Sequence, residues 1–340
     1  VATILIGSFC GMISMRHKEA IERPWWACAI GVGMEVMHLT IVMIMVRPFD
    51  LAWDIVRQIA IPFILVNGIG FMLMSSIIVY TKKQRQIMLE KSRLESELGV
   101  ASVIQHSMLP EIGSLYPGRK EVDVSASMEA AKEVGGDFYD VFFVDQQRIA
   151  FVVGDVSGKG VPAALFMANS KIVMQNCVRD IPNLSDALAG VNQALCMKNE
   201  ADMFLTAWVG ILDLKTKELT YISAGHNPPV FCHKGKIQLL KGKNSFILGG
   251  MEGMKYKENV MQMDEGDLLF IYTDGVVEAE TSEHELFGED RLLQCFRTYA
   301  SRSASKTIDI VRVAVNDFVR GNSQFDDMTM LCMKINATEE

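Results

Sequence analysis

The stretches GGDFYDVFFVD (residues 135–145) and RIAFVVGDVSGKG (148–160) decide the fold of this 340-residue chain. Each contains a run of apolar residues, largely β-branched or aromatic, with Gly and Asp at one end of the run. Short apolar runs bounded by such residues are typical of buried strands. We therefore expect two strands here, with Asp137 at the start of the first and Asp155 at the end of the second.

Runs of the same kind continue toward the end of the chain, separated by a few helical patterns. The helical patterns cover residues 162–177, 184–195, 289–300 and 305–319. Strands that follow one another, with helices in longer blocks, favour an α+β sandwich over alternating βαβ units. The further strand-like runs are VDVSAS (122–127), FLTAWVGILDL (204–214), LTYISAG (219–225), DLLFIYTDG (267–275) and DMTMLCMKI (327–335).

Acidic residues stand at the ends of four of these runs: Asp137, Asp155, Asp274 and the pair Asp326–Asp327. A single such residue is most simply a turn aspartate. Several that converge would be partly desolvated and would repel one another, and divalent cations relieve that repulsion. Ligand sets made only of oxygen select Mg²⁺ or Mn²⁺ over zinc. The seven cysteines are scattered and form no CxxC pair, so a thiolate site is not expected. The pattern predicts a two-metal site.

Charge is distributed unevenly along the chain. Residues 1–80 carry five Lys or Arg and five acidic side chains, so the net charge of −8 belongs to the remainder. This pattern excludes a fully soluble single-domain protein. It also argues against nucleic acid as a partner, because phosphate backbones are bound by surfaces with an excess of Lys and Arg.

Residues 25–46 and 59–80 are apolar runs long enough to cross a bilayer as helices. Residues 1–15 are expected to end a further span, and because the chain starts at Val1, we expect more of this module upstream. Basic residues before the first complete span and after the last predict that both flanks are cytoplasmic and that the loop at 47–54 is outside. These basic residues are Arg16, Lys18, Arg23, Lys82, Lys83 and Arg85.

Glu35 and His38 lie three residues apart, on one face of the first complete span. Ionisable groups at membrane depth usually line a bundle interior or a ligand cavity. A sensing role and a plain interhelical hydrogen bond both stay open. The run EVMHLTIVMIMVRPFDLAWDIVRQIAIPFILVNGIG (35–70) resembles the closing helices of the five-span receptor module found ahead of LytS-type bacterial sensors. That resemblance implies a sensor in the bacterial cell membrane, in contact with membrane lipid, with a cytoplasmic output domain.

Residues 82–109 are rich in strong helix formers and connect the last span to the output domain. Ile87, Leu94, Ala101 and Met108 recur every seven residues, while Lys91 and Gln105 occupy positions where a second apolar residue belongs. We interpret this connector as a weak parallel coiled coil that pairs two copies of the chain. A solvated single linker helix is the alternative.

Five motifs between Glu133 and Leu331 resemble the SpoIIE/RsbU-type branch of the metal-dependent (PPM) protein serine/threonine phosphatases. The resemblance implies a four-layer α/β/β/α sandwich with the metals between two central sheets. The domains would then be residues 1–80, 81–109 and 110–340. The motifs are EVGGDFYDVF (133–142), GDVSGKGVPAALFM (154–167), SAGHNPP (223–229), LLFIYTDGVVEA (268–279) and DDMTML (326–331), and ASVIQHSMLP (101–110) resembles the helix that leads into that domain.

When the family's functional positions are carried over to the matching motifs, the resemblance implies a site for two Mn²⁺ or Mg²⁺ ions. Asp155 would bridge both ions, with support from the Val156 carbonyl. Asp274 and Asp326 would hold the first ion and Asp137 would lie against the second. Asp327 stays an alternative to its neighbour Asp326. A water shared by two cations has a lowered pKa, so hydroxide would attack phosphoserine or phosphothreonine without a protein nucleophile.

The groups that would bind phosphate and protonate the leaving oxygen stay open. The wider phosphatase family has a phosphate-binding Arg before the first acidic motif and a His shortly after the bridging Asp, where this chain has Ser157. Lys132 is a candidate for the phosphate and His226 for the proton, and Lys159 is a further candidate. A surface position for Lys132 and a turn role for His226 are the simpler alternatives.

For the substrate, the resemblance points to a phosphorylated anti-sigma-factor antagonist, which is a small STAS-domain protein. A catalytically silent, phosphatase-like scaffold that binds a regulatory protein is the competing function. Two other functions, a GGDEF-type cyclase and a nucleotide-binding phosphate loop, are excluded because their motifs do not match. GGDF lacks the Glu of a GGDEF cyclase hairpin, and GDVSGKG has the wrong spacing and the wrong last residue for a nucleotide-binding phosphate loop.

Overall fold

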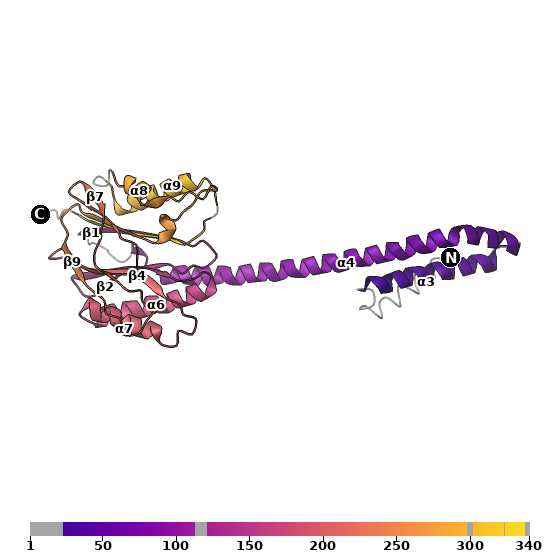
Figure 1. The fold of residues 1–340 in the computed structure, drawn as a ribbon, viewed down its shortest axis with the longest axis horizontal. Helices are drawn as coiled ribbons and strands as arrows, with labels where there is room; N and C mark the ends of the chain where they lie inside the picture. Colours follow the sequence, from indigo (N-terminus) through magenta and orange to yellow (C-terminus); the bar gives the residue numbers. More distant parts are fainter. Residues whose placement is uncertain (1–22, 113–120, 298–301, 323, 337–340) are drawn as a thin grey trace. The chain divides into compact units, whose positions relative to one another are not determined.

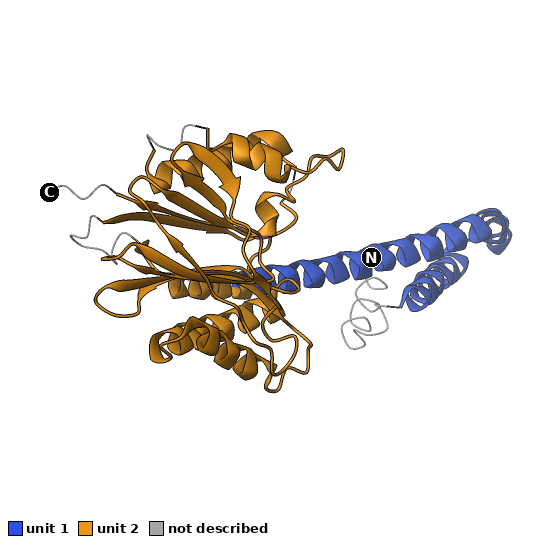
Figure 2. Ribbon diagram, turned by 60° about the vertical axis from the view of Figure 1, so that its left-hand side comes forward, with its two compact units in different colours: residues 1–96 blue, residues 97–340 orange. Residues whose placement is uncertain are grey.

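A computed structural model of the chain describes residues 23–112, 121–297, 302–322 and 324–336. The chain divides into two compact units, residues 1–96 and 97–340 (Figure 2). The span predicted at residues 1–15 and the basic flank at Arg16 and Lys18 lie outside the described residues.

Two helices, α3 (Pro24–Met45) and α4 (Phe49–Met108), are the long apolar elements of the described chain. Helix α3 matches the span predicted at 25–46. Helix α4 is continuous over 60 residues and contains both the second predicted span and the connector. The loop predicted at 47–54 is wrong for most of its length, because the helix already begins at Phe49; the side of the membrane on which this segment lies stays a prediction. Pro48, whose fixed φ suits the start of a helix, immediately precedes it.

Helices α3 and α4 approach each other closely where glycines remove side-chain bulk. A Cβ on Gly31 would come within 2.8 Å of the Asn67 carbonyl oxygen, and a Cβ on Gly68 within 3.0 Å of Val32. Small residues at such positions let the backbones of membrane helices pack tightly. Many other apolar side chains of α4 are exposed, as expected for a surface that faces lipid.

The second unit contains two mainly antiparallel sheets. The first has the order β1-β11-β10-β6-β7 and the second the order β2-β3-β4-β5-β8, with β9 also paired to β5. The strands of the first sheet are β1 (Val122–Glu129), β6 (Val230–His233), β7 (Lys236–Leu239), β10 (Leu268–Tyr272) and β11 (Met328–Ile335). Those of the second are β2 (Phe138–Phe143), β3 (Arg148–Val156), β4 (Leu205–Asp213), β5 (Glu218–Ala224), β8 (Asn244–Ser245) and β9 (Asn259–Gln262).

Helices cover the outer face of each sheet, as Figure 1 shows. Helices α6 (Val161–Asp180) and α7 (Leu184–Cys196) pack on the second sheet. Helices α8 (Gly288–Gln294) and α9 (Ala304–Val319) pack on the first. The four-layer α/β/β/α sandwich is confirmed.

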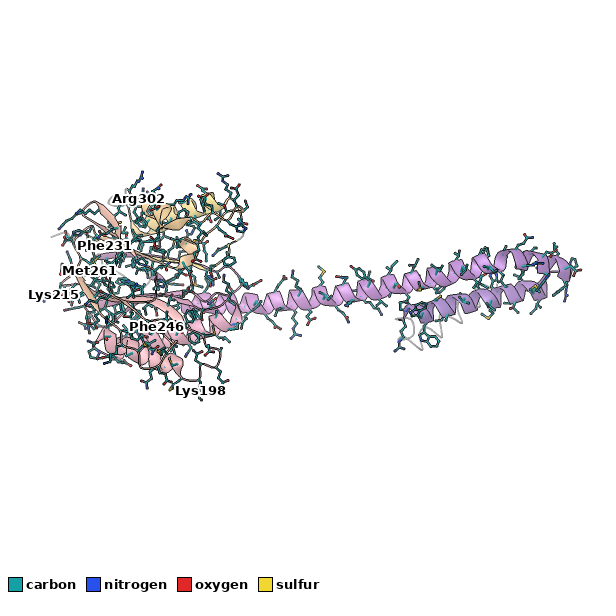
Figure 3. The ribbon with its side chains drawn as sticks, viewed as in Figure 1. Lys198, Lys215, Phe231, Phe246, Met261 and Arg302 are labelled. Carbon is teal, nitrogen blue, oxygen red and sulfur yellow. The ribbon has the colours of Figure 1, made fainter. Side chains whose placement is uncertain are left out.

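A third apolar layer fills the space between the two sheets. Phe231 of β6 and Met261 of β9, both labelled in Figure 3, belong to it. Strand β3 explains why its sequence is apolar throughout: Phe151 faces this inner layer, while its neighbours Ala150 and Val152 face α6 and α7. Side chains alternate along a strand, so a strand covered on both faces needs apolar residues at every position.

Candidate metal centre

Strand pairing brings the four predicted aspartate segments to one place. Asp137 immediately precedes β2, and Asp155 lies near the end of β3, which pairs with β2. Asp274 begins the short 3₁₀ helix η1 (Asp274–Val276) after β10, and Asp326 comes two residues before β11, which pairs with β10. Each sheet therefore contributes two neighbouring acidic segments.

Repulsion among these carboxylates shows that they share one electrostatic environment. Burial is the largest cause that raises the pKa of Asp137 well above its ordinary value, and the charges of Asp155 and Asp327 add to it. Burial, followed by the charges of Asp274 and Asp326, raises the pKa of Asp155 to about 7. The pKa of Asp274 is raised by burial and by Asp326. Such a cluster is poorly satisfied without a cation.

Asp137 forms the deepest part of this cluster and is 2% exposed. Its Oδ2 accepts a hydrogen bond of 2.7 Å from the Thr273 hydroxyl. The backbone N–H of Thr329 in turn donates to Thr273 Oγ1 at 2.9 Å. Asp137, next to one sheet, is thereby linked to β11 of the other.

The adjacent residues Asp326 and Asp327 have different environments, which the sequence did not separate. Asp327 Oδ1 accepts from the N–H of Ala131 at 2.8 Å, and its Oδ2 accepts from the N–H of Gly136 at 2.7 Å. A Cβ on Gly135 would come within 2.2 Å of that same Oδ2. Asp327 therefore anchors the loop that carries Asp137, and only glycine permits so close an approach.

Gln105, near the end of α4, holds the same loop from the other side. Its Nε2 donates to the Gly135 carbonyl at 2.7 Å, and its Oε1 accepts from the Gly135 N–H at 3.1 Å. Gln105 is 4% exposed. This contact was not predicted from the sequence, although a glutamine at a position where a coiled coil needs an apolar residue was a sign that it has a buried partner.

Asp326 uses its two carboxylate oxygens differently: Oδ1 accepts from the N–H of the adjacent Asp327 at 3.0 Å, and Oδ2 faces a lysine. Lys159 Nζ lies 2.9 Å from Asp326 Oδ2 and donates to the Phe325 carbonyl at 2.8 Å. It also lies 3.9 Å from the centre of the Phe325 ring. Lys159, whose role the sequence left open, thus lies at the edge of the carboxylate cluster.

Within the described residues, no three His, Cys, Asp or Glu side chains are arranged as a formed ion site. Asp327 is committed to backbone donors and Asp326 to Lys159, which accounts for this arrangement. The chemistry of the site nevertheless fits hard divalent cations, since the donors are carboxylates with raised pKa and the Val156 carbonyl lies beside Gly136.

The candidates for phosphate binding and proton transfer lie in contrasting positions. Lys132 is exposed, in the loop that Asp327 anchors. His226 is buried, its Nδ1 lies 3.1 Å from the Thr206 hydroxyl, and burial lowers its pKa to about 4. The Ser157 hydroxyl accepts from the Phe204 N–H at 2.9 Å, which ties down the turn after β3.

In the first unit, Glu35 and His38 are close neighbours and a third polar residue joins them. Glu35 Oε1 lies 3.6 Å from His38 Nδ1, and Asn67 Nδ2 of α4 donates to Glu35 Oε2 at 2.5 Å. Glu35 is 7% exposed. Asn67 was not predicted from the sequence, because its partner Glu35 lies 32 residues away on a different helix.

Comparison with known proteins finds one family match within each of the two units. Residues 145–336 match the family model described as Stage II sporulation protein E (SpoIIE), and residues 1–80 match the 5TMR of 5TMR-LYT model. The structure of the SiaA-PP2C domain of Pseudomonas aeruginosa superposes with a TM-score of 0.65 at 21% identity, covering 73% of this chain and 99% of that domain. That likeness shows the phosphatase fold.

Two curated relatives cover most of the chain. Protein IcfG of Synechocystis sp. is 29% identical over 75% of this chain, which spans 44% of IcfG. Phosphoserine phosphatase RsbU of Bacillus subtilis is 27% identical over 72% of this chain, which spans 71% of RsbU. The chain thus spans less than half of the first relative and about two thirds of the second. With more than half of its length matched by one family model, and with the fold and the acidic motifs in agreement, the chain belongs to the SpoIIE family and carries a LytS-type receptor module ahead of its SpoIIE domain.

Proposed function

We propose that this chain is a membrane-anchored, metal-dependent protein serine/threonine phosphatase with its phosphatase domain in the cytoplasm. One observation carries the proposal: carboxylates from four separate segments lie in one electrostatic cluster, in which burial and neighbouring carboxylates raise the pKa of Asp137, Asp155 and Asp274. Buried like charges are costly in a fold that has no use for them. In a member of this family, the use that fits them is binding divalent cations.

Four carboxylates would hold two Mn²⁺ or Mg²⁺ ions: Asp137, Asp155, Asp274 and Asp326. When bound, such ions activate a water and neutralise charge on the phosphoryl oxygens. Asp155 stands between the contributions of the two sheets, which suits a bridging role. Thr273 fixes the orientation of Asp137, and Asp327 fixes the loop that carries it. We assign Asp327 to this support and Asp326 to the ions.

The remaining candidates take different roles in this proposal. His226 is buried, and because burial lowers its pKa to about 4, its imidazole ring is uncharged at neutral pH. It therefore suits the neutral turn role of its motif better than the role of an acid. Lys132 is exposed beside the site and remains the candidate that meets a phosphoprotein from solution.

For the substrate we propose a phosphorylated regulatory protein, specifically a STAS-domain anti-sigma-factor antagonist. The support is the similarity to RsbU, which is named a phosphoserine phosphatase. We further propose that two chains pair through the connector. Ile87 and Leu94 of the predicted seven-residue column are 50% and 56% exposed and are available to a partner helix.

The test measures phosphate release by the full chain in nanodiscs, with a phosphorylated STAS-domain protein and with p-nitrophenyl phosphate, in Mn²⁺ and in chelator. We expect Mn²⁺-dependent release that falls on the order of a thousandfold in Asp155→Asn and Asp274→Asn. Asp145→Asn is the matched control, because Asp145 is an exposed turn residue bonded to Gln147 and Arg148. Binding of the phosphoprotein without turnover by the wild-type chain would instead favour the silent scaffold.

A further inference from the structure

Lys159 lies in a loop whose shape is set by the neighbouring residues and does not depend on the contacts of the Lys159 side chain. The loop follows β3 and is flanked by Gly158 and Gly160, whose φ angles of +86° and +78° favour glycine. The N–H of Ser157 donates to the Phe204 carbonyl at 2.9 Å, and the Phe204 N–H donates back to the Ser157 hydroxyl at 2.9 Å. This anchored turn brings the Lys159 backbone close to the carboxylate cluster.

The Lys159 ammonium is held by three partners from the segment before β11. These are the Asp326 carboxylate at 2.9 Å, the Phe325 carbonyl at 2.8 Å and the face of the Phe325 ring at 3.9 Å. A lysine on an ordinary surface is bound mainly by water, and an exposed ion pair contributes little. Here the side chain is 34% exposed, and the contacts fix its charge at the edge of the site.

The charge of Lys159 acts on more of the cluster than its direct partner. It lowers the pKa of Asp274 and that of Glu278, in opposition to their burial. Asp326 is also one of the charges that raise the pKa of Asp155. The ammonium thus supplies, from the protein itself, part of the positive charge that this group of carboxylates requires.

We propose that Lys159 is a substrate-binding residue that exchanges partners: it pairs with Asp326 while the site lacks an ion, and it contacts the substrate phosphate once Asp326 binds a divalent cation. The inference rests on the proposed function. Asp326 Oδ1 already accepts from the Asp327 N–H and Oδ2 from Lys159, so a divalent cation would compete with the ammonium for Oδ2 and would repel its charge. The released ammonium sits on a four-carbon stem beside the place where a phosphate dianion would approach, and it binds phosphate well.

The experiment measures two ligands on the full chain in nanodiscs by calorimetry. Mn²⁺ is titrated into chelator-treated protein, and inorganic phosphate is titrated into Mn²⁺-saturated protein. In Lys159→Met, which keeps most of the stem length but not the charge, we expect Mn²⁺ to bind roughly three- to tenfold more tightly and phosphate to bind more weakly by a similar factor. Lys159→Arg should keep both values near those of the wild type.

The opposite signs of the two changes separate this role from a structural one, because a damaged site would weaken both ligands. Lys215→Met is the matched control for general charge, since Lys215 is exposed in the turn between β4 and β5 and is not part of the carboxylate cluster. The proposal is overturned if either change is absent in Lys159→Met or if Lys215→Met reproduces either of them. If the wild-type chain binds no Mn²⁺ at all, the proposed function itself fails, and this inference fails with it.

Discussion

At the floor of the candidate metal centre, carboxylates are held by N–H groups of a separate loop and by a threonine hydroxyl, whereas at its rim the Asp326 carboxylate accepts only from the N–H of its own neighbour Asp327 and from one flexible lysine among the bonds described. The floor consists of Gly135, Asp137, Gly275 and Asp327, and the rim of Gly158, Lys159, Phe325 and Asp326. Backbone donors cannot leave without unfolding their loop, but a lysine side chain can rotate away. The difference indicates that the fold fixes the floor and that ligands rearrange the rim.

The largest expected effect comes from adding one methyl group to the floor. In Gly275→Ala, the new Cβ would lie 2.0 Å from the Asp327 carbonyl oxygen, so the backbone must move. We expect a loss of about 3 kcal/mol or more in unfolding free energy. At the rim, a Cβ on Gly158 would meet no described atom within 4 Å, and only its φ of +86° opposes the change. Gly158→Ala should cost about 1 kcal/mol. Denaturant unfolding measures both losses of unfolding free energy. Equal losses in the two variants would contradict the distinction between floor and rim.

The next largest expected effect is a dependence of stability on pH, caused by Asp155, which lies in the same carboxylate cluster as the floor and the rim. A carboxyl whose pKa is raised by folding stabilises the protein below its unfolded pKa and loses that contribution as the pH rises through the folded value. The pKa of Asp155 rises from 3.8 to about 7, so the chelator-treated chain should become less stable between about pH 4 and pH 7. We expect its Tm to fall by about 5 to 10 °C from pH 5 to pH 8.

Calorimetric scans in chelator and in excess Mn²⁺ measure this loss. Bound ions should reduce it, and Asp155→Asn should flatten it without any ion. A Tm that rises with pH in chelator would contradict the electrostatic account of the cluster.

Removing the two hydrogen bonds between Gln105 of α4 and Gly135 of the floor should have a smaller effect. In Gln105→Met, the N–H and C=O of Gly135 lose buried partners at 3.1 and 2.7 Å, and we expect a loss of about 2 kcal/mol together with weaker Mn²⁺ binding. His106→Ala is the control, since that exposed ring contacts only the Ser102 carbonyl of its own helix among the bonds described. A Gln105→Met chain with wild-type Mn²⁺ affinity would show that the floor does not depend on α4.

The fold was largely predictable because strands such as β3 are covered on both faces and are apolar at every position. The four acidic segments were predictable because strand ends are marked by Gly and Asp. The separate environments of Asp326 and Asp327 were not, since they depend on which backbone approaches each carboxylate. The partners of Gln105 and Lys159 lie 30 and 166 residues away, beyond the range of any local pattern. The helical start at Phe49 was hidden because Arg47, Pro48 and Asp50 are also typical of a turn.

The smallest expected effect comes from the hydrogen bond between helices α3 and α4, which lies far along the chain from the metal centre. Asn67→Leu removes the hydrogen bond to Glu35, and interhelical bonds of this kind contribute about 0.6 kcal/mol. We expect a slight loss of stability for residues 23–96 and unchanged Mn²⁺ binding. Thr40→Val is the control, since the Thr40 hydroxyl bonds within its own helix to the Val36 carbonyl. Hydrogen exchange along α3 measures the change, and exchange equal in both variants would show that the Glu35–Asn67 bond does not stabilise the pair.

Manganese electron paramagnetic resonance on the full chain in nanodiscs tests the central claim, that Asp137, Asp155, Asp274 and Asp326 bind a pair of ions, most directly. A carboxylate shared by two Mn²⁺ ions couples their spins. The account predicts two bound ions per chain with a coupled spectrum, and loss of the coupling in Asp155→Asn but not in Asp145→Asn. A single uncoupled ion in the wild type, or a coupled spectrum that survives Asp155→Asn, would contradict it.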